Sequence, residues 1–139
     1  MCIRDRSKSK TGALIVIEQS IPLELYEKTG DMIDAEINSR LIENIFFKNS
    51  PLHDGAMIIA HDRIKAAGCI LPVSHDTNIP RSMGLRHRSA LGISQATDAA
   101  AVVVSEETGS ISFAHRGKII SRLSSTDLEN RLSRLVTDE

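Results

Sequence analysis

The apolar run ALIVI at residues 13–17, directly after Gly12, says most about the fold of this chain. Continuous runs of this kind are typical of strands buried on both faces of a partly parallel sheet. Working outward from it, residues 32–37 alternate apolar and polar and predict a half-buried strand. Two further strand pairs are expected, at 56–60 with 64–71 around a tight turn, and at 102–104 with 111–114.

Helices are expected between these strands. A short one begins near Pro22 and ends near Gly30, and a second, capped by Ser39, carries the apolar stripe Leu41, Ile42, Ile45 and Phe46. A third covers residues 86–97, and a C-terminal helix starts at a capping box of Thr126 and Glu129. The order of elements predicts an α/β fold with a mixed central β-sheet flanked by helices.

Composition limits the function. The 139 residues suit one domain, expected at 11–139, after a flexible leader or non-native start at 1–10. A net charge of -1 with three Phe, one Tyr and no Trp argues against a nucleic-acid binder. No apolar run approaches the roughly 20 residues of a membrane span. Cys2 and Cys69 form no CxxC or disulfide framework, which favours a cytoplasmic location.

One polar cluster occurs at the predicted start of the 86–97 helix, where Gly84-Leu85 precedes Arg86, His87, Arg88 and Ser89. Free helix N–H groups and two guanidiniums together suit a phosphate. Two arginines at a helix start are electrostatically unfavourable unless an anion or a carboxylate offsets them, so a structural salt bridge is the alternative.

Two other polar clusters adjoin predicted strands. His53, Asp54 and Gly55 stand directly before one strand, where they suit a divalent metal or the orientation of a hydroxyl group. The alternative for them is an ordinary Asx turn. Ser105, Glu106 and Glu107 follow another strand and suit a phosphate or metal contact, with a solvated turn as the alternative.

Four segments together resemble the diadenylate cyclase domain, most of all its membrane-associated type: TGALIVIE at 11–18, PLHDGA at 51–56, GLRHRSALGISQATDA at 84–99 and VVVSEETGSIS at 102–112. The resemblance implies the fold of that domain and the condensation of two ATP into cyclic di-AMP with release of two pyrophosphates. It also implies Mg²⁺ or Mn²⁺ as cofactor, and a homodimer in which the sites of two chains face each other.

Roles follow from the same resemblance, position by position. The catalytic residues would be Asp54, Gly55, Ala56, Arg86, His87 and Arg88. ATP would be bound by Gly55, Leu71, Leu85, Arg86, Ser89, Ser105 and Glu106, with Leu71 near adenine. The metal would be held by His53, Asp54 and Glu107.

Two departures from the family pattern leave alternatives open. Leu85 stands where many relatives have Thr, and Ile70 where Tyr is frequent, so a change in ATP affinity is expected. A catalytically silent nucleotide-binding regulatory module of the same fold is the second hypothesis, and a phosphohydrolase using His53 and Asp54 is the third. Relatives of this type also carry membrane helices before the domain, so this chain is expected to contact a membrane only through such a missing region.

Overall fold

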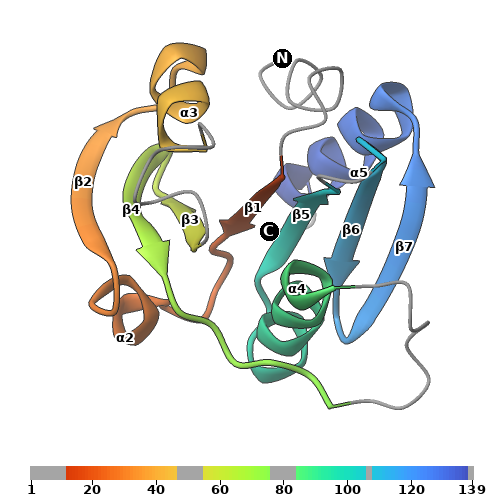
Figure 1. Ribbon diagram of the computed structural model, residues 1–139, viewed down its shortest axis with the longest axis horizontal. Helices are drawn as coiled ribbons and strands as arrows, with labels where there is room; N and C mark the ends of the chain where they lie inside the picture. The colour runs from red at the N-terminus through yellow and green to blue at the C-terminus, as the bar shows by residue number, and fades with distance from the viewer. Residues whose placement is uncertain (1–11, 47–54, 76–83, 106–107, 138–139) are drawn as a thin grey trace.

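A computed structural model of the chain describes residues 12–46, 55–75, 84–105 and 108–137. Its centre is a seven-stranded mixed sheet with the order β2-β4-β3-β1-β5-β6-β7 (Figure 1). The strands are β1 (Ala13–Ile17), β2 (Asp31–Glu36), β3 (Ala56–Ala60), β4 (Arg63–Cys69), β5 (Ala100–Val104), β6 (Ile111–His115) and β7 (Lys118–Leu123). The helices are α2 (Glu24–Glu27), α3 (Ser39–Ile45), α4 (Leu85–Ala96) and α5 (Ser125–Thr137).

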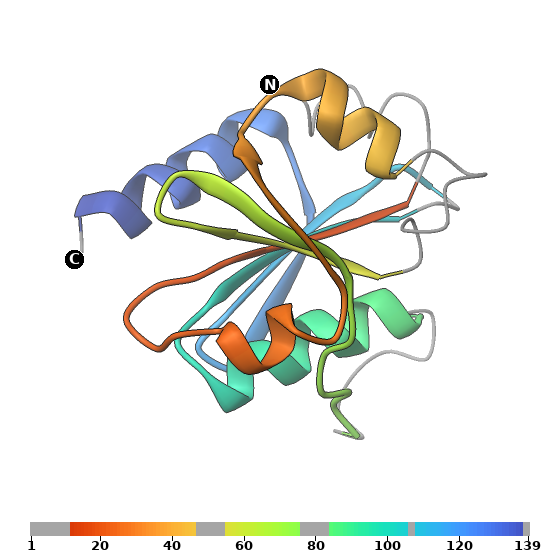
Figure 2. The same cartoon turned by 90° about the vertical axis from the view of Figure 1, so that its left-hand side faces the viewer.

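Strand β1 lies at the centre of the sheet, as its apolar run predicts. It pairs in parallel with β3 and antiparallel with β5, and Ala13 to Val16 are buried. Ala13 and Ile15 pack into one apolar cluster, with residues of α3 and α5, while Leu14 and Val16 pack into a second, with residues of α4. Figure 2 shows the corresponding layers, with α3 and α5 on one face of the sheet and α2 and α4 on the other.

The structure confirms the expected α/β architecture and corrects two helix caps. Asn38 caps α3, since its side-chain oxygen accepts a hydrogen bond from the Leu41 N–H at 2.8 Å, and Ser39 is the first helical residue. At α5 the reciprocal bonds join Ser124 and Asp127, two residues before the expected box. Both errors arise because adjacent positions carry side chains that can cap a helix.

Strand β7 was not expected from the sequence. It forms an edge of the sheet, antiparallel to β6, and its residues alternate between exposed and half-buried. Residues 118–123 read KIISRL, a short segment with only partial alternation, so the apolar pattern that marks β1 is absent. The tight turn before it places Arg116 and Gly117 at positive φ.

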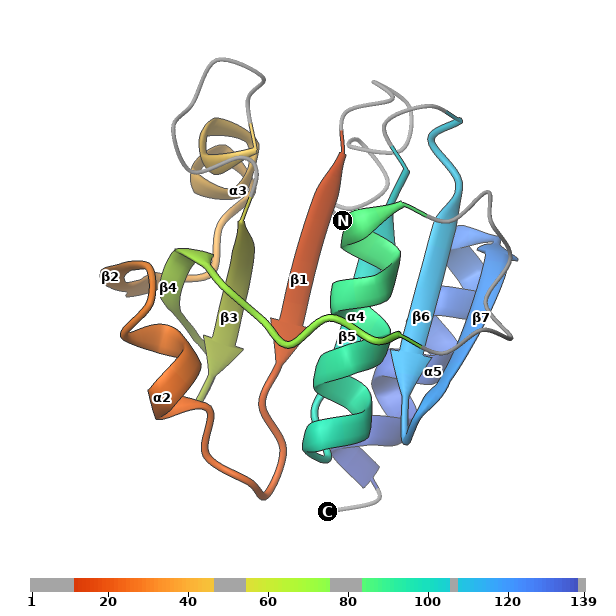
Figure 3. The ribbon, with the colours of Figure 1, turned by 60° about the horizontal axis from the view of Figure 1, so that its bottom comes forward.

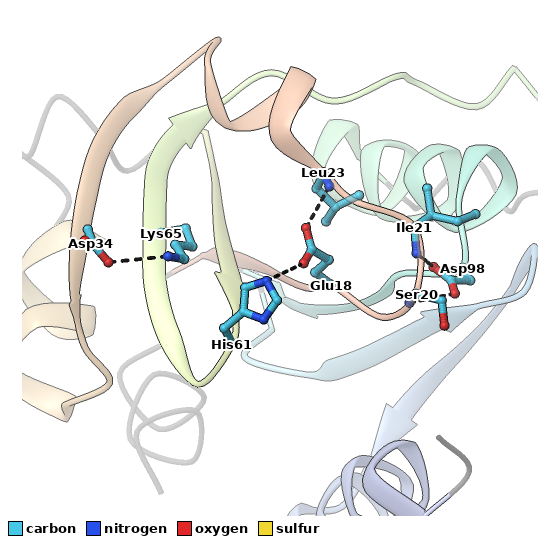
Figure 4. Close-up of polar contacts among 8 residues, drawn as sticks. All are labelled: Glu18, Ser20, Ile21, Leu23, Asp34, His61, Lys65 and Asp98. Carbon is cyan, nitrogen blue, oxygen red and sulfur yellow. Dashed lines mark hydrogen bonds and ion pairs between the residues drawn. The ribbon is translucent and has the colours of Figure 1, made fainter.

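The connection from β1 to α2 is held at one end of the sheet by carboxylates (Figure 4). Asp98 accepts hydrogen bonds from the backbone N–H groups of Ser20 and Ile21 at 2.9 and 3.0 Å, and Glu18 accepts one from Leu23 at 2.7 Å. Partial burial opposes the charge of Asp98, but the backbone donors outweigh it and hold the pKa of this carboxyl below its ordinary value.

We expect Asp98→Ala to lower the free energy of unfolding by about 1 kcal/mol, because two N–H groups lose a charged acceptor at a partly exposed site. Urea unfolding at neutral pH measures the change. Glu24→Ala is the matched control, since Glu24 pairs with Lys28 at 3.9 Å on the open surface, where its side chain is 74% exposed. The control should lose less. Equal losses would show that the Asp98 bonds do not hold the connection.

Candidate functional site

Several sequence-predicted site residues meet at one end of the sheet, opposite the Asp98 contacts. Parallel β1 and β3 both begin there, so Gly12 and Gly55, which directly precede them, lie at the same end of the sheet. Strand β5 ends there, with Val104 opposite Ala13, and β4 ends there, with Cys69 opposite Ala56. Figure 3 shows this end of the sheet at the top of the view, with the start of α4 in front of the sheet. This end of the sheet therefore combines the amino ends of the two parallel strands with the carboxyl ends of β4 and β5.

Helix α4 brings the arginine cluster to this end of the sheet. Its N-cap is Gly84, which has no side chain to cap the helix, and its first turn contains no acidic residue. Arg86, His87 and Arg88 are half-buried there, and Ser89 follows them, while Leu85 is 68% exposed. An uncapped helix start with two guanidiniums favours an anion.

The surroundings of His87 favour the neutral form of its imidazole. Burial is the larger cause and the neighbouring Arg86 guanidinium the smaller, and both lower the pKa of the imidazole from its ordinary 6.5. A neutral imidazole adds no third positive charge to the cluster. It can instead donate one hydrogen bond and accept another.

The lowered pKa makes stability of the free protein depend on pH. The unfolded chain takes up the His87 proton below about pH 6.5 and the folded chain resists it, so stability is full above that pH and falls as pH decreases. Between pH 7.5 and 6.0 we expect His87 to account for a loss of less than about 1 kcal/mol. Urea unfolding of wild type and His87→Asn measures it. Identical pH dependence in the two proteins would contradict the assignment.

Gly55 directly precedes β3, whose first residue, Ala56, pairs with Cys69 of the neighbouring strand β4. A Cβ atom built at Gly55 would overlap the backbone of Gly68 and lie 2.9 Å from the Cys69 nitrogen. Ala56 is buried. Gly55, the glycine of the Asp-Gly-Ala (DGA) motif at 54–56, is therefore needed for close packing of the two strands, whether or not it also contacts a ligand. Close approach of a nucleotide to this backbone stays a prediction.

The segment that follows β4 crosses β1 and α4 (Figure 3). Ile70 is 70% exposed and its N–H donates to the Thr29 hydroxyl at 2.7 Å, whereas Leu71 is 7% exposed and packs in the cluster beneath α4. Farther along, the Ser74 N–H donates to the Arg88 carbonyl at 3.0 Å. The segment thus connects the expected adenine side of the site to the helix that bears the arginines.

Ser105 is half-buried at the end of β5 and opens the turn to β6. Its N–H donates to the Ser110 carbonyl at 3.0 Å and its carbonyl accepts from Gly109 at 2.8 Å. Its hydroxyl accepts a long bond, 3.4 Å, from the Thr108 N–H. These bonds fit a turn residue.

Four predicted site residues, His53, Asp54, Glu106 and Glu107, lie outside the described residues. The described parts of the chain contain no group of three or more His, Cys, Asp or Glu that could hold a metal ion. Gly55 directly follows Asp54, and Ser105 directly precedes Glu106. Both of these described residues lie at this end of the sheet. Imidazole and carboxylate groups are suitable ligands for Mn²⁺, and carboxylates for Mg²⁺.

The fold is a mixed α/β domain, and a helix start that bears arginines lies at the ends of its strands. These features are those of the class of nucleotide-binding domains. The model of one family, DAC, described as DisA bacterial checkpoint controller nucleotide-binding, matches residues 1–119. The chain belongs to this DAC family.

Its relatives support the assignment. The chain is 42% identical over 126 residues to cyclic di-AMP synthase CdaA of Bacillus subtilis, covering 91% of this chain and 46% of that protein. It is 45% identical over 122 residues to cyclic di-AMP synthase CdaS of the same organism, covering 88% and 58%. The chain therefore spans about half the length of these curated relatives.

Solved structures agree with the fold. A crystal structure of a double mutant of DacA from Staphylococcus aureus matches with a TM-score of 0.94 and 43% identity, over 96% of this chain and 89% of that one. A protein from Bacillus cereus, described as a hypothetical membrane spanning protein, matches with a TM-score of 0.84 and 41% identity, over 88% and 60%. Among the described residues here, no helix is long and apolar enough to cross a membrane.

Proposed function

We propose that this domain condenses two ATP molecules into cyclic di-AMP and releases two pyrophosphates. The observation that carries the proposal is the meeting of Gly55, Arg86 and Ser105 at one end of the sheet, in a chain of the DAC family. Relatives named cyclic di-AMP synthase and diadenylate cyclase, at 40% to 45% identity, support the same reaction. The domain itself would comprise residues 11–139.

The phosphates are the part of ATP that α4 suits best. Arg86 and Arg88 present guanidiniums whose planar donors match phosphoryl oxygens, and the helix start adds backbone N–H groups. Neutral His87 supplies a hydrogen bond without further charge. Ser89, Ser105 and Glu106 would complete the polar contacts to the nucleotide, and Leu85 would add an apolar one.

The adenine side is formed by aliphatic groups. Leu71 lies two residues after β4, and most of its side chain is buried in the core. It can present only an edge to a purine, while neighbouring Ile70 is largely exposed. We therefore expect adenine to be held by aliphatic contact and not by ring stacking, which matches the shortage of aromatic residues.

Chemistry requires two chains. Each ribose 3′-oxygen would attack the α-phosphorus of the ATP on the facing chain, and the bond from that phosphorus to pyrophosphate would break. Asp54 would orient the 3′-hydroxyl and accept its proton. Gly55 and Ala56 would hold Asp54 at the start of β3. A monomer holds one ATP only, so the active form would be a homodimer, with no nucleic acid as partner.

Metal dependence follows the family. His53, Asp54 and Glu107 would hold Mg²⁺ or Mn²⁺, which supplies neutralisation of the charge on phosphoryl oxygens when it is bound. We place the domain in the cytoplasm, where ATP is available and free cysteines such as Cys69 persist. Any membrane contact would come from a region outside this chain.

Incubation with ATP and either Mg²⁺ or Mn²⁺, followed by chromatographic separation of nucleotides, tests the proposal. We expect cyclic di-AMP and two pyrophosphates for each molecule formed. ATP that binds in calorimetry but is never consumed would contradict the proposal and indicate a silent regulatory module. Release of AMP or inorganic phosphate in place of a cyclic product would contradict it in favour of a phosphohydrolase.

A further inference from the structure

Gly12 lies directly against the guanidinium of Arg86. A Cβ atom built at Gly12 would lie 2.6 Å from Arg86 Nη1, 2.7 Å from Cζ and 3.1 Å from Nη2. Gly12 is buried directly before β1, and Arg86 is in the first turn of α4, so the contact joins the start of the central strand to the helix of the site. The space that a side chain would take at position 12 is occupied by the guanidinium.

The backbone does not require glycine at this position. Three described glycines, Gly68, Gly109 and Gly117, have positive φ, and Gly12 is not among them. Alanine could adopt its conformation without strain. The reason for glycine at 12 is therefore space, and the group that needs the space is Arg86.

The part that would give way distinguishes Gly12 from other closely packed glycines. At Gly55 an added Cβ would meet the backbone of Gly68, which is held within the sheet. At Gly12 it would meet the far end of a flexible arginine side chain, which can move by rotation about its own bonds. A methyl group at 12 should therefore displace the guanidinium and leave the fold intact.

We propose that Gly12 is a positioning residue of the nucleotide site, which by lacking a side chain sets where the Arg86 guanidinium lies. The inference rests on the proposed function in one respect, that Arg86 contacts phosphate. A guanidinium recognises phosphoryl oxygens through donors in a rigid plane, so a displacement of about 1 Å removes much of its effect.

Gly12→Ala tests this, combined with Arg86→Lys in a double-mutant cycle. We expect Gly12→Ala to keep the circular dichroism spectrum and to lower the rate of cyclic di-AMP formation by roughly 10- to 100-fold. In the Arg86→Lys background, the same change should lower the rate, or weaken ATP binding in calorimetry, by less than about 3-fold. The coupling distinguishes positioning of Arg86 from a general structural role.

Three outcomes would overturn the inference: an unchanged rate in Gly12→Ala, an equal loss in both backgrounds, or loss of folded structure. A wild-type protein that makes no cyclic product would count against the proposed function alone. In that case the Arg86 Nε–H resonance in NMR spectra decides the inference. It should shift in Gly12→Ala, and an unshifted resonance would overturn the inference.

Discussion

Asp54→Asn should lower the rate of cyclic di-AMP formation by about 10²- to 10⁴-fold. The amide has nearly the shape of the carboxylate, but it neither accepts the proton of a 3′-hydroxyl nor carries charge toward a metal. Because the arginines on α4 are untouched, the variant should still bind ATP. Product formation by chromatography and ATP binding by calorimetry measure the two effects separately.

Asp62→Asn is the matched control for this substitution. Asp62 is exposed in the turn between β3 and β4, at the other end of β3 from Gly55. Its φ of 60° is a conformation that Asn tolerates. The control should keep the wild-type rate. If Asp54→Asn also kept it, the 3′-hydroxyl would have to be activated by another group, and the role of the DGA motif would be wrong.

Gly92→Ala should lower the free energy of unfolding by about 2 kcal/mol. A Cβ atom at Gly92 would overlap the carbonyl oxygen of Pro72 and lie 3.0 Å from the Ser74 nitrogen, both backbone atoms of the segment that crosses α4. Forcing them apart costs about 3 kcal/mol, while alanine gains about 1 kcal/mol in helix propensity. Strain against backbone therefore outweighs propensity. Urea unfolding measures the difference.

Gly84→Ala serves as the control for Gly92→Ala. A Cβ atom at Gly84 meets nothing within 4 Å, so its effect is confined to the N-cap of α4 and should stay below about 1 kcal/mol. A Gly92→Ala protein as stable as this control would show that the segment after β4 moves freely over the helix. The link between the expected adenine side and the arginines would then be loose.

Much of the fold was predictable because its centre is marked by apolar runs. The run at 13–17 has to be buried on both faces, and in the structure its residues alternate between two packed clusters. The edge strand β7 lacks such a run, since half of its surface faces solvent. Capping residues were displaced by one or two positions because Asn38 and Ser39, like Ser124 and Thr126, compete for the same role.

The candidate site was predictable as a set of motifs, but its packing was not. Sequence places Arg86 at a helix start and Gly55 before a strand. It cannot show that the backbone of Gly68 fills the space beside Gly55, or that Leu71 is mostly buried in the core. Nor can it show that Gly12 lies against the guanidinium of Arg86. These contacts join residues far apart in the chain, and no local pattern encodes them. The Gly directly before the β1 run was the only available signal for Gly12.

The central claim is that two facing chains of this domain make cyclic di-AMP. The most direct test is the rate of cyclic di-AMP formation per chain, with ATP and Mg²⁺ or Mn²⁺, over a series of protein concentrations. We expect the rate per chain to rise with concentration as dimers form and then to reach a plateau. The absence of cyclic di-AMP at every concentration with both metals would contradict the claim.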